Sequence, residues 1–159
     1  MLICTIWKEM HKFIITSSIG VGKTELTSFD NALIKCKIAN YNLVKISSIL
    51  PANSKKVDDI DLPEGSVLFT AYAAISTNLN GQHISAAVGV GIPKDKTKIG
   101  VIMECSGYCG KDEIEIKLKN MIVEAMLSRG YEIDEILFEA KDVIATNDYV
   151  TAFAAISIW

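Results

Sequence analysis

The pattern of apolar and polar residues divides the chain into segments typical of strands and two segments typical of helices. Alternating or continuous apolar runs that end in turn residues predict seven strands. These are residues 12–17, 41–50, 66–76, 83–93, 99–105, 132–140 and 149–159. Short polar segments separate the third, fourth and fifth strands, at residues 78–82 and 94–98, so we expect a hairpin at each of these two positions.

Two further segments carry apolar residues at helical spacing. The first covers residues 28–40, and Ser28 or Asp30 is expected to cap its start. The second covers residues 112–130, where Asp112 and a glutamate three residues later resemble a capping box and an Arg-Gly pair is a typical stop. Because strands and helices do not alternate strictly, we expect an α+β fold with helices layered on antiparallel or mixed sheets.

Length and composition fit one folded domain covering residues 1–159. Of these residues 50% are hydrophobic and 22% are charged, which is enough to bury a core and argues against disorder. The net charge of −3, without a basic block, argues against nucleic-acid binding. No apolar run reaches the roughly 20 residues of a membrane span, and the apolar first residues lack a basic lead, so we expect neither a membrane segment nor a signal peptide. Irregularly spaced cysteines indicate reduced thiols in a cytoplasm: Cys4, Cys36, Cys105 and Cys109.

Two glycine-containing segments resemble nucleotide-binding motifs but depart from them. In "SSIGVGKT", Gly22, Lys23 and Thr24 fit the end of a phosphate-binding loop, but Ser17 stands where the first glycine is required. The segment "GVGIPKDK", residues 89–96, lacks the third glycine of a dinucleotide fingerprint and a helix after it. We therefore interpret both segments as strand ends and turns, and a nucleotide-binding module remains the weaker alternative.

The cysteines and histidines do not form a recognisable metal or triad pattern. Cys105 and Cys109 have no second pair and no nearby histidine in the sequence, so the spacing of a zinc site is missing. No aspartate partner can be assigned to His11 or His83, which argues against a Ser-His-Asp arrangement. We expect no bound metal.

The serine pair Ser47-Ser48 ends a strand-like run and precedes a polar loop. It can be an ordinary transition from strand to loop, because serine pairs are frequent and rarely reactive. The alternative is backbone self-cleavage, in which the hydroxyl of Ser48 attacks the carbonyl carbon of Ser47. The resulting ester would eliminate to dehydroalanine, which hydrolyses to a pyruvoyl group. Such a reaction needs a strained or well-held peptide and a donor for the developing oxyanion.

Three polar residues are candidates for chemistry, and each also has an ordinary structural interpretation. Glu104 follows an apolar strand, where partial desolvation would let its carboxyl group carry a proton near neutral pH; otherwise it simply faces water. Asp30 can be a carboxylate at a helix N-terminus. Asn42 can be a turn residue at a strand start.

The chain resembles the archaeal pyruvoyl-dependent arginine decarboxylases from about residue 13 to its end. The stretches that carry the resemblance are "FDNAL", "NLVKISSILP", "TAYA", "ISAAVGVGIPKDK", "GVIMECSG" and "AFAAISIW". The combination of the serine-pair segment with the "IPKDK" and "IMECSG" segments is specific to this family.

The resemblance implies a precursor that cuts itself into a short β chain, residues 1–47, and a long α chain, residues 48–159. Ser48 would become a covalent pyruvoyl group, and neither pyridoxal phosphate nor a metal would be needed. The implied fold is a four-layer α/β/β/α sandwich, and the implied assembly is a homotrimer with active sites between subunits. The implied reaction converts L-arginine to agmatine and CO2 through a Schiff base on the pyruvoyl group, which would feed polyamine biosynthesis.

The resemblance also implies roles for individual residues. Glu104 matches the acidic residue that protonates carbon after CO2 has left, and Asn42 matches a residue that holds the Ser47 carbonyl during processing. Asp30 matches the carboxylate that pairs with the substrate guanidinium. Leu26, Tyr41 and Ser47 would line the substrate pocket.

Two residues depart from the family pattern beside the expected guanidinium site. Tyr41 is bulkier than the small aliphatic residue expected there, and Ala39 replaces a glycine. A decarboxylase of a related amino acid therefore remains an alternative. So does a relative that has lost activity and acts as an oligomeric binding or structural protein.

Overall fold

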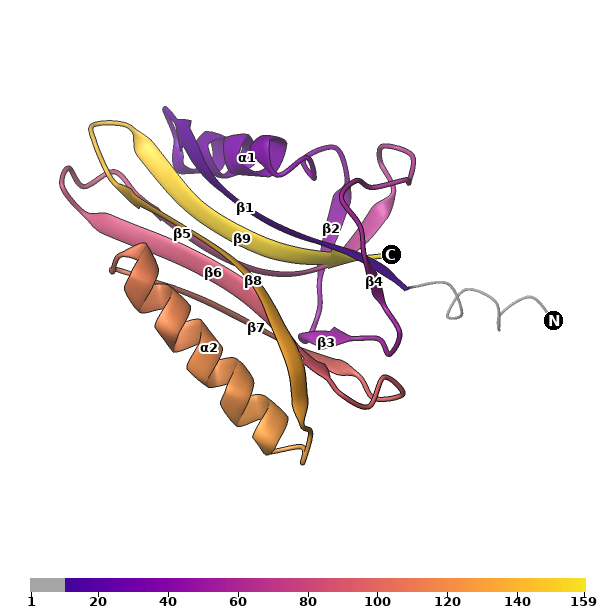
Figure 1. Cartoon of the computed structure of the whole chain (residues 1–159). Helices are drawn as coiled ribbons and strands as arrows, with labels where there is room; N and C mark the ends of the chain where they lie inside the picture. Colours follow the sequence, from indigo (N-terminus) through magenta and orange to yellow (C-terminus); the bar gives the residue numbers. More distant parts are fainter. Residues whose placement is uncertain (1–10) are drawn as a thin grey trace.

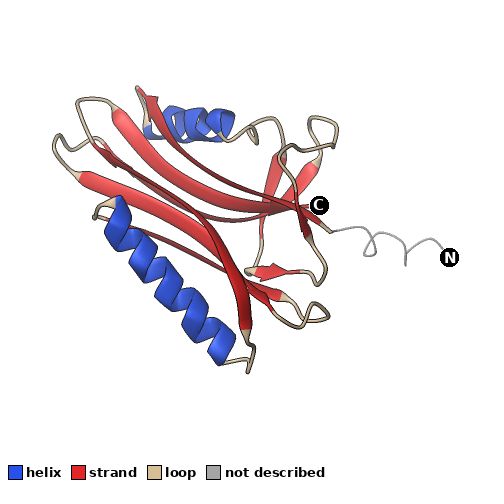
Figure 2. Ribbon diagram, viewed as in Figure 1, coloured by secondary structure: helices blue, strands red, loops and turns tan. Residues whose placement is uncertain are grey.

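Two β-sheets pack face to face in the computed structural model, which describes residues 11–159, and one helix covers the outer face of each sheet (Figures 1 and 2). The five-stranded sheet has the order β2-β5-β9-β1-β4 and the four-stranded sheet has the order β3-β7-β6-β8. The predicted α+β, four-layer sandwich is confirmed. The elements are β1 (Lys12–Gly22), α1 (Glu25–Lys35), β2 (Asn42–Lys45), β3 (Ile49–Leu50), β4 (Lys55–Lys56), β5 (Val67–Thr77), β6 (His83–Pro93), β7 (Gly100–Gly107), α2 (Lys111–Leu127), β8 (Ile133–Ile144) and β9 (Tyr149–Ile158).

The most buried strands lie inside the sheets and are rich in small and β-branched residues. β9 pairs antiparallel with both β1 and β5, and β6 pairs antiparallel with both β7 and β8. Almost every residue of β6 and β9 is buried, because each strand has a packed layer on both of its faces. This burial explains why both segments read as nearly continuous apolar runs in the sequence.

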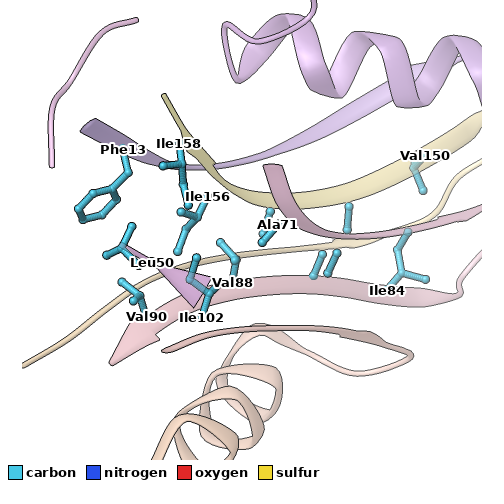
Figure 3. Packing of buried hydrophobic residues seen from close by; sticks show 14 of the residues in the cluster. Phe13, Leu50, Ala71, Ile84, Val88, Val90, Ile102, Val150, Ile156 and Ile158 are labelled. Atoms are coloured by element: carbon cyan, nitrogen blue, oxygen red, sulfur yellow. The ribbon is translucent and has the colours of Figure 1, made fainter. Parts of the chain in front are cut away.

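The core between the sheets combines alanines with larger aliphatic and aromatic side chains (Figure 3). Leu50 from β3 and Phe13 from β1 meet Val88 and Ile102 of the four-stranded sheet in this layer. The alanines let the sheets approach closely along the rest of the interface, since a methyl group adds little thickness. They are Ala71, Ala73, Ala86, Ala152 and Ala154.

Glycines allow each helix to lie close to its sheet. A Cβ atom added at Gly20 of β1 would lie 1.9 Å from the carbonyl oxygen of Ser28 in α1, so no larger residue fits there. A Cβ atom at Gly91 of β6 would lie 2.8 Å from Ile122 of α2. The two glycine-containing segments of the sequence therefore serve helix packing. The predicted apolar face of α2 is confirmed, since Leu118 and Ile122 are fully buried.

The expected hairpin between the third and fourth predicted strands is wrong. β5 and β6 belong to different sheets, and the connection at residues 78–82 crosses from one sheet to the other. Two backbone hydrogen bonds hold this crossing against the β8–β9 connection, from Gly81 N–H to the Ala145 carbonyl (2.9 Å) and from Ala145 N–H to the Gln82 carbonyl (2.8 Å). Strand periodicity is the same in a hairpin and in such a crossing, so the pattern could not separate them. The second expected hairpin, β6–β7, is confirmed.

Both predicted helix starts are wrong. α1 begins at Glu25 and is capped by Thr24, whose side chain accepts a hydrogen bond from the Thr27 N–H in a capping box. Ser28 is instead buried inside the helix, where its Oγ lies 2.6 Å from Thr151 Oγ1, and Asp30 lies in the exposed second turn.

α2 begins at Lys111, one residue before the predicted capping aspartate. Its N-cap residue is Gly110, which has no side chain to accept a hydrogen bond from the first turn. A carboxylate from another strand replaces the missing cap. Asp142 of β8 accepts a hydrogen bond from the Lys111 N–H at 3.0 Å. The local sequence could not reveal this cap, because its two members are 31 residues apart.

Candidate active site

The serine pair lies where the chain crosses from one sheet to the other. β2 pairs with β5 at the edge of the five-stranded sheet, and β3 pairs with β7 at the edge of the four-stranded sheet. The predicted continuous strand 41–50 is therefore wrong, because residues 46–48 connect two strands in different sheets. The Ile46 N–H donates to the Thr70 carbonyl (3.3 Å), and the Ile102 N–H donates to the Ser48 carbonyl (2.9 Å). The two sheets thus hold the segment at both ends.

Ser48 combines a hydrogen bond to a carboxylate with an unusual backbone conformation. Its Oγ donates to Glu104 Oε2 at 2.8 Å. Its φ angle is +23°, in a region that residues other than glycine rarely adopt, so the backbone at this position is strained. The hydroxyl is half-buried, whereas Ser47 is exposed. The structure therefore brings together Ser47, Ser48 and Glu104.

Glu104 faces the layer between the two sheets. It pairs with Val88 of β6, which belongs to the core between the sheets, and it is two residues from the buried Ile102 on the same face of β7. Of the described strands, only β3 pairs with the outer side of β7, at Val101 and Gly100, so these strands leave β7 open on that side next to Glu104. The carboxylate consequently lies at an accessible end of an apolar layer.

This arrangement suits attack of a hydroxyl group on the preceding peptide bond. The Ser48 hydroxyl belongs to the residue that follows the Ser47 carbonyl, and its proton already points to a carboxylate oxygen that can accept it. Within residues 11–159, the Ser47 carbonyl accepts no hydrogen bond. A donor for the oxyanion is the one part of this reaction that the described residues of a single chain do not supply.

Asp30 and Leu26 lie away from the serine pair in a single chain. Both are on the exposed face of α1, which packs on the outer face of the five-stranded sheet (Figure 1). Glu104 instead faces the inner layer. Asp30 forms no hydrogen bond with any described residue, and apolar side chains flank it one turn away on either side: Leu26 is 75% exposed and Ile34 is 55% exposed. Such a stripe of apolar residues around a carboxylate is typical of a surface that another chain covers.

Asn42 and Tyr41 also lie away from the Ser47 carbonyl. Asn42 Nδ2 donates to the Gly65 carbonyl at 2.7 Å. β2 is extended from Asn42 to Lys45 and rises about 3.3 Å per residue, so it carries the chain roughly 10 Å away from Asn42 before the crossing to Ser47 begins. The Tyr41 hydroxyl donates to the Leu62 carbonyl at 3.2 Å, and Tyr41, like Ala39, packs against the apolar cluster on the outer face of the five-stranded sheet. Within a single chain, Asn42 and Tyr41 therefore lie apart from the serine pair.

Sequence reasoning missed the backbone partners of the cleavage segment. Ile102 and Thr70 hold it through main-chain atoms, and main-chain contacts depend on strand register and not on side-chain identity. It also missed Lys45, the last residue of β2 before the crossing, whose Nζ lies 4.6 Å from the centre of the Tyr72 ring. A lysine close before the serine pair was the only available signal for this contact.

The structure corrects the interpretation of His83. Its Nε2 lies 2.8 Å from Asp142 Oδ2, so an aspartate partner exists. The imidazole ring also lies close to Gly110, the residue after Cys109. Burial acts to raise the pKa of Asp142, but the hydrogen bonds from His83 and from the Lys111 N–H outweigh it and hold the pKa below its usual value. This group caps α2 and is remote in the fold from the serine pair.

The segment that resembles a phosphate-binding loop is occupied by contacts of its own. Thr24 and Thr27 satisfy each other's backbone N–H groups, and Lys23 forms an ion pair with Asp148 at 2.8 Å.

In the described part of the chain, no group of three or more His, Cys, Asp or Glu side chains could hold a metal ion. The helices of residues 11–159 are all too short or too polar to cross a membrane. The first ten residues, including Cys4 and the expected edge segment, lie outside the described residues.

Comparison with known proteins identifies the family of the chain. The sequence profile of the pyruvoyl-dependent arginine decarboxylases matches residues 12–158. A pyruvoyl-dependent arginine decarboxylase of Thermococcus kodakarensis is 38% identical, covering 94% of this chain and 96% of its own. Homologues of the same name from Methanococcus aeolicus and Methanocaldococcus jannaschii are 41% and 42% identical, covering 96% and 87% of this chain and 92% and 83% of their own. The chain therefore belongs to the family of pyruvoyl-dependent arginine decarboxylases.

Proposed function

We propose that this protein is a self-processing decarboxylase that converts L-arginine to agmatine and CO2 with a pyruvoyl group made from Ser48. Family membership supports the reaction type and the substrate. The observation that carries the proposal is the 2.8 Å hydrogen bond from Ser48 Oγ to Glu104 Oε2, at a strained residue next to an exposed peptide bond. The product would supply polyamine biosynthesis.

Processing would divide the chain into residues 1–47 and 48–159. Glu104 Oε2 accepts the proton of the Ser48 hydroxyl, whose oxygen then attacks the Ser47 carbonyl carbon. The Ser47–Ser48 amide breaks, and an ester forms in its place. Loss of the Ser48 α-proton breaks the ester, releases the Ser47 carboxylate and leaves dehydroalanine at residue 48. Water then replaces the nitrogen as ammonia, which yields the pyruvoyl group.

The same carboxyl group is suited to a second proton transfer. When formed, the pyruvoyl group supplies a carbonyl that binds the substrate amine and withdraws electrons as CO2 leaves. Residue 48 stays held by the Ile102 N–H after cleavage, since that bond is made by its own carbonyl oxygen. Glu104 would therefore remain beside residue 48, from which its Oε2 could deliver the proton that replaces CO2. The apolar layer behind Glu104 limits access of water to this step.

The site would be completed by a neighbouring subunit in a homotrimer. Among residues 11–159, residues 71–77 of β5 and residues 102–107 of β7 have a strand neighbour on one side only. These open edges lie on the side of the sandwich where the serine pair is found, and a second chain would cover them. Asp30 of a neighbour would then bind the substrate guanidinium in a bidentate contact, with Leu26 and Tyr41 lining the pocket. Asn42 of a neighbour would hold the Ser47 carbonyl during processing.

A cytoplasmic location fits the sulfur chemistry of the chain. Cys36, Cys105 and Cys109 are free thiols, and burial raises the pKa of Cys36 and Cys105, which keeps both in the unreactive protonated form. An inactive relative is the competing interpretation. It requires that the contact between Ser48 and Glu104 be only structural.

A substrate assay separates these possibilities. Purified protein is incubated with arginine, lysine, ornithine and histidine in turn, and released CO2 and the amine product are measured. We expect agmatine from arginine, with a kcat/KM at least about tenfold higher than for any other amino acid, because a bidentate ion pair adds more than 1.4 kcal/mol of selectivity. Absence of CO2 release with all four would support the inactive relative. A preference for another amino acid would overturn the role of Asp30 and leave the reaction type intact.

A further inference from the structure

The outer face of α2 carries an apolar stripe that packs against no other described element. Ile116, Val123 and Leu127 are 62%, 38% and 68% exposed, and Asn120 lies between them. These four residues, which we call the α2 stripe, are separated by four, three and four positions and so lie along one side of the helix. Figure 2 shows α2 lying on the outside of the sandwich, against one sheet only. The opposite side packs on β6, β7 and β8.

The α2 stripe has the spacing of a coiled-coil seam. In an antiparallel pair of identical helices, Ile116 would contact Leu127 of the second copy, and Asn120 would lie beside its Val123. The same pairs recur on the other side of the two-fold axis, so the surface is complementary to itself. A polar asparagine in such a seam costs stability but fixes the alignment of the two helices. The pattern therefore specifies a partner helix and its direction.

Charges beside the stripe complement each other across the same axis. On one flank of α2, Glu115 forms ion pairs with Lys111 and Lys119 within the helix, at 3.6 and 3.9 Å. On the other flank, Lys117 and Glu124 form no ion pair with any described residue, and seven positions, roughly 10 Å of helix, separate them. In the antiparallel pair, Lys117 of each copy faces Glu124 of the other, which gives two ion pairs.

We propose that the α2 stripe is an interface through which two copies of this chain pair as antiparallel helices. A helix of 17 residues is about 25 Å long, so the contact is smaller than the roughly 800 Å² per partner of a standard stable interface. The pairing is accordingly reversible in an isolated chain. It becomes strong when several copies of α2 in one assembly pair at once. The contact lies on the outer face of the four-stranded sheet, away from the open edges, so it adds to any assembly made there and does not depend on the proposed activity.

Charge reversal tests this pairing. Lys117→Glu and Glu124→Lys each place like charges opposite each other twice, and the double variant restores opposite charges in exchanged positions. We expect native mass spectrometry and sedimentation of the wild type to give twice as many chains as the Val123→Asp variant. Each single reversal should raise the dissociation constant of the pairing about tenfold or more, and the double variant should return to within a few-fold of the wild type.

Two controls separate pairing from folding. Leu79→Lys changes a residue with the same 62% exposure as Ile116 on a different surface, and it should leave the number of chains unchanged. Circular dichroism and the decarboxylation rate should be unaffected in every variant. Equal numbers of chains in the wild type and Val123→Asp would overturn the proposal. A double variant that stays dissociated would also overturn it. So would single charge-reversal variants that fall apart into single chains and lose activity, because the substitution would then have disrupted the whole assembly.

Discussion

The sandwich carries two serine–glutamate hydrogen bonds of nearly the same length, one at each side. Ser48 donates to Glu104 at 2.8 Å where β2 crosses to β3, and Ser17 of β1 donates to Glu139 of β8 at 2.9 Å at the other side. Ser17 lies in the middle of a regular antiparallel ladder opposite Ala154. Ser48 lies between two strands, with a positive φ angle and an exposed neighbour.

The difference between the two pairs lies in the backbone. A hydrogen bond from a serine hydroxyl to a carboxylate does not by itself make the serine reactive. At Ser17 the ladder hydrogen bonds fix the backbone, so the preceding carbonyl carbon cannot move toward the hydroxyl. At Ser48 the ladder is interrupted, the Ser47 carbonyl is free of hydrogen bonds from the described residues, and the backbone is strained. The pair at Ser17 therefore serves as an internal control for the pair at Ser48.

Replacing each serine by alanine should give the largest contrast. In Ser48→Ala the nucleophile and the source of the pyruvoyl group are lost, so decarboxylation should fall to the rate without enzyme. In Ser17→Ala only one hydrogen bond between the sheets is lost, so activity should stay within about twofold and stability should fall by about 1 kcal/mol. Assays of CO2 release and urea unfolding measure both quantities. Equal losses of activity in the two variants would remove the distinction between the two sides.

The two glutamates should differ in the rate of chain cleavage. Glu104→Gln removes the acceptor of the Ser48 proton, and general base catalysis is typically worth about 10²- to 10⁴-fold, so cleavage should slow by that order. Glu139→Gln keeps the shape of its contact with Ser17 and should cleave at the wild-type rate. Denaturing electrophoresis over time after synthesis gives both rates. Wild-type cleavage in Glu104→Gln would assign the proton transfer to another group.

Asp30 should affect substrate binding and not cleavage. Asp30→Ala should lower kcat/KM for arginine by roughly tenfold to a hundredfold, the effect of losing a charge-assisted hydrogen bond, with normal cleavage. Asp112→Ala changes an exposed aspartate of α2 and serves as the matched control.

Mixing subunits extends this test. If Asp30 of one chain serves Ser48 of its neighbour, then Asp30→Ala and Ser48→Ala chains produced together should regain part of the activity that each lacks. Mixed assemblies without any gain would show that both residues act within one chain, contrary to their separate positions in the fold.

The contacts of Asp142 with the Lys111 N–H and His83 lie away from both serine–glutamate pairs, and their loss shows how much stability a purely structural carboxylate contributes. Asp142→Asn weakens the cap of α2 and the contact with His83, so stability at pH 7 should fall by about 1 kcal/mol. Because the folded state lowers the pKa of Asp142, its contribution is complete above the ordinary aspartate value of about 3.9 and is lost as the pH falls through the lowered value. The difference between the wild type and the variant in urea unfolding should therefore begin to shrink below about pH 4 and disappear below the lowered pKa of Asp142. A difference that persists at lower pH would exclude the carboxylate as its cause.

The sequence predicted the layers of this fold better than its connections. The periodicity of residues 112–130 identified the buried face of α2, and the continuous apolar runs located β6 and β9. The crossing between β5 and β6 was missed, because residues in a crossing and in a hairpin alternate in the same way. The caps were missed for a different reason. Thr24 lies before the apolar pattern of α1 starts, and Asp142 reaches α2 from a distant strand.

The site was predicted mainly through resemblance to a family. Taken alone, Ser47-Ser48 and Glu104 are common residues at strand ends, and 56 positions separate the two members of the hydrogen bond. Their contact depends on the register of β3 against β7, which pairs Ile49 with Val101 and so places Ser48 next to Ile102. No property of either segment alone determines this register. The separation of Asp30 from Ser48 within one chain likewise follows from the layers and not from the motifs.

The intact mass of the denatured, purified protein shows whether Ser48 becomes a pyruvoyl group. We expect two chains, residues 1–47 and residues 48–159, with the longer one lighter by one ammonia than simple hydrolysis after Ser47 would leave it. A carbonyl-reactive hydrazine should add once to the longer chain. A single uncut chain of 159 residues that persists on incubation, or a longer chain that begins with an unmodified serine, would show that no pyruvoyl group forms.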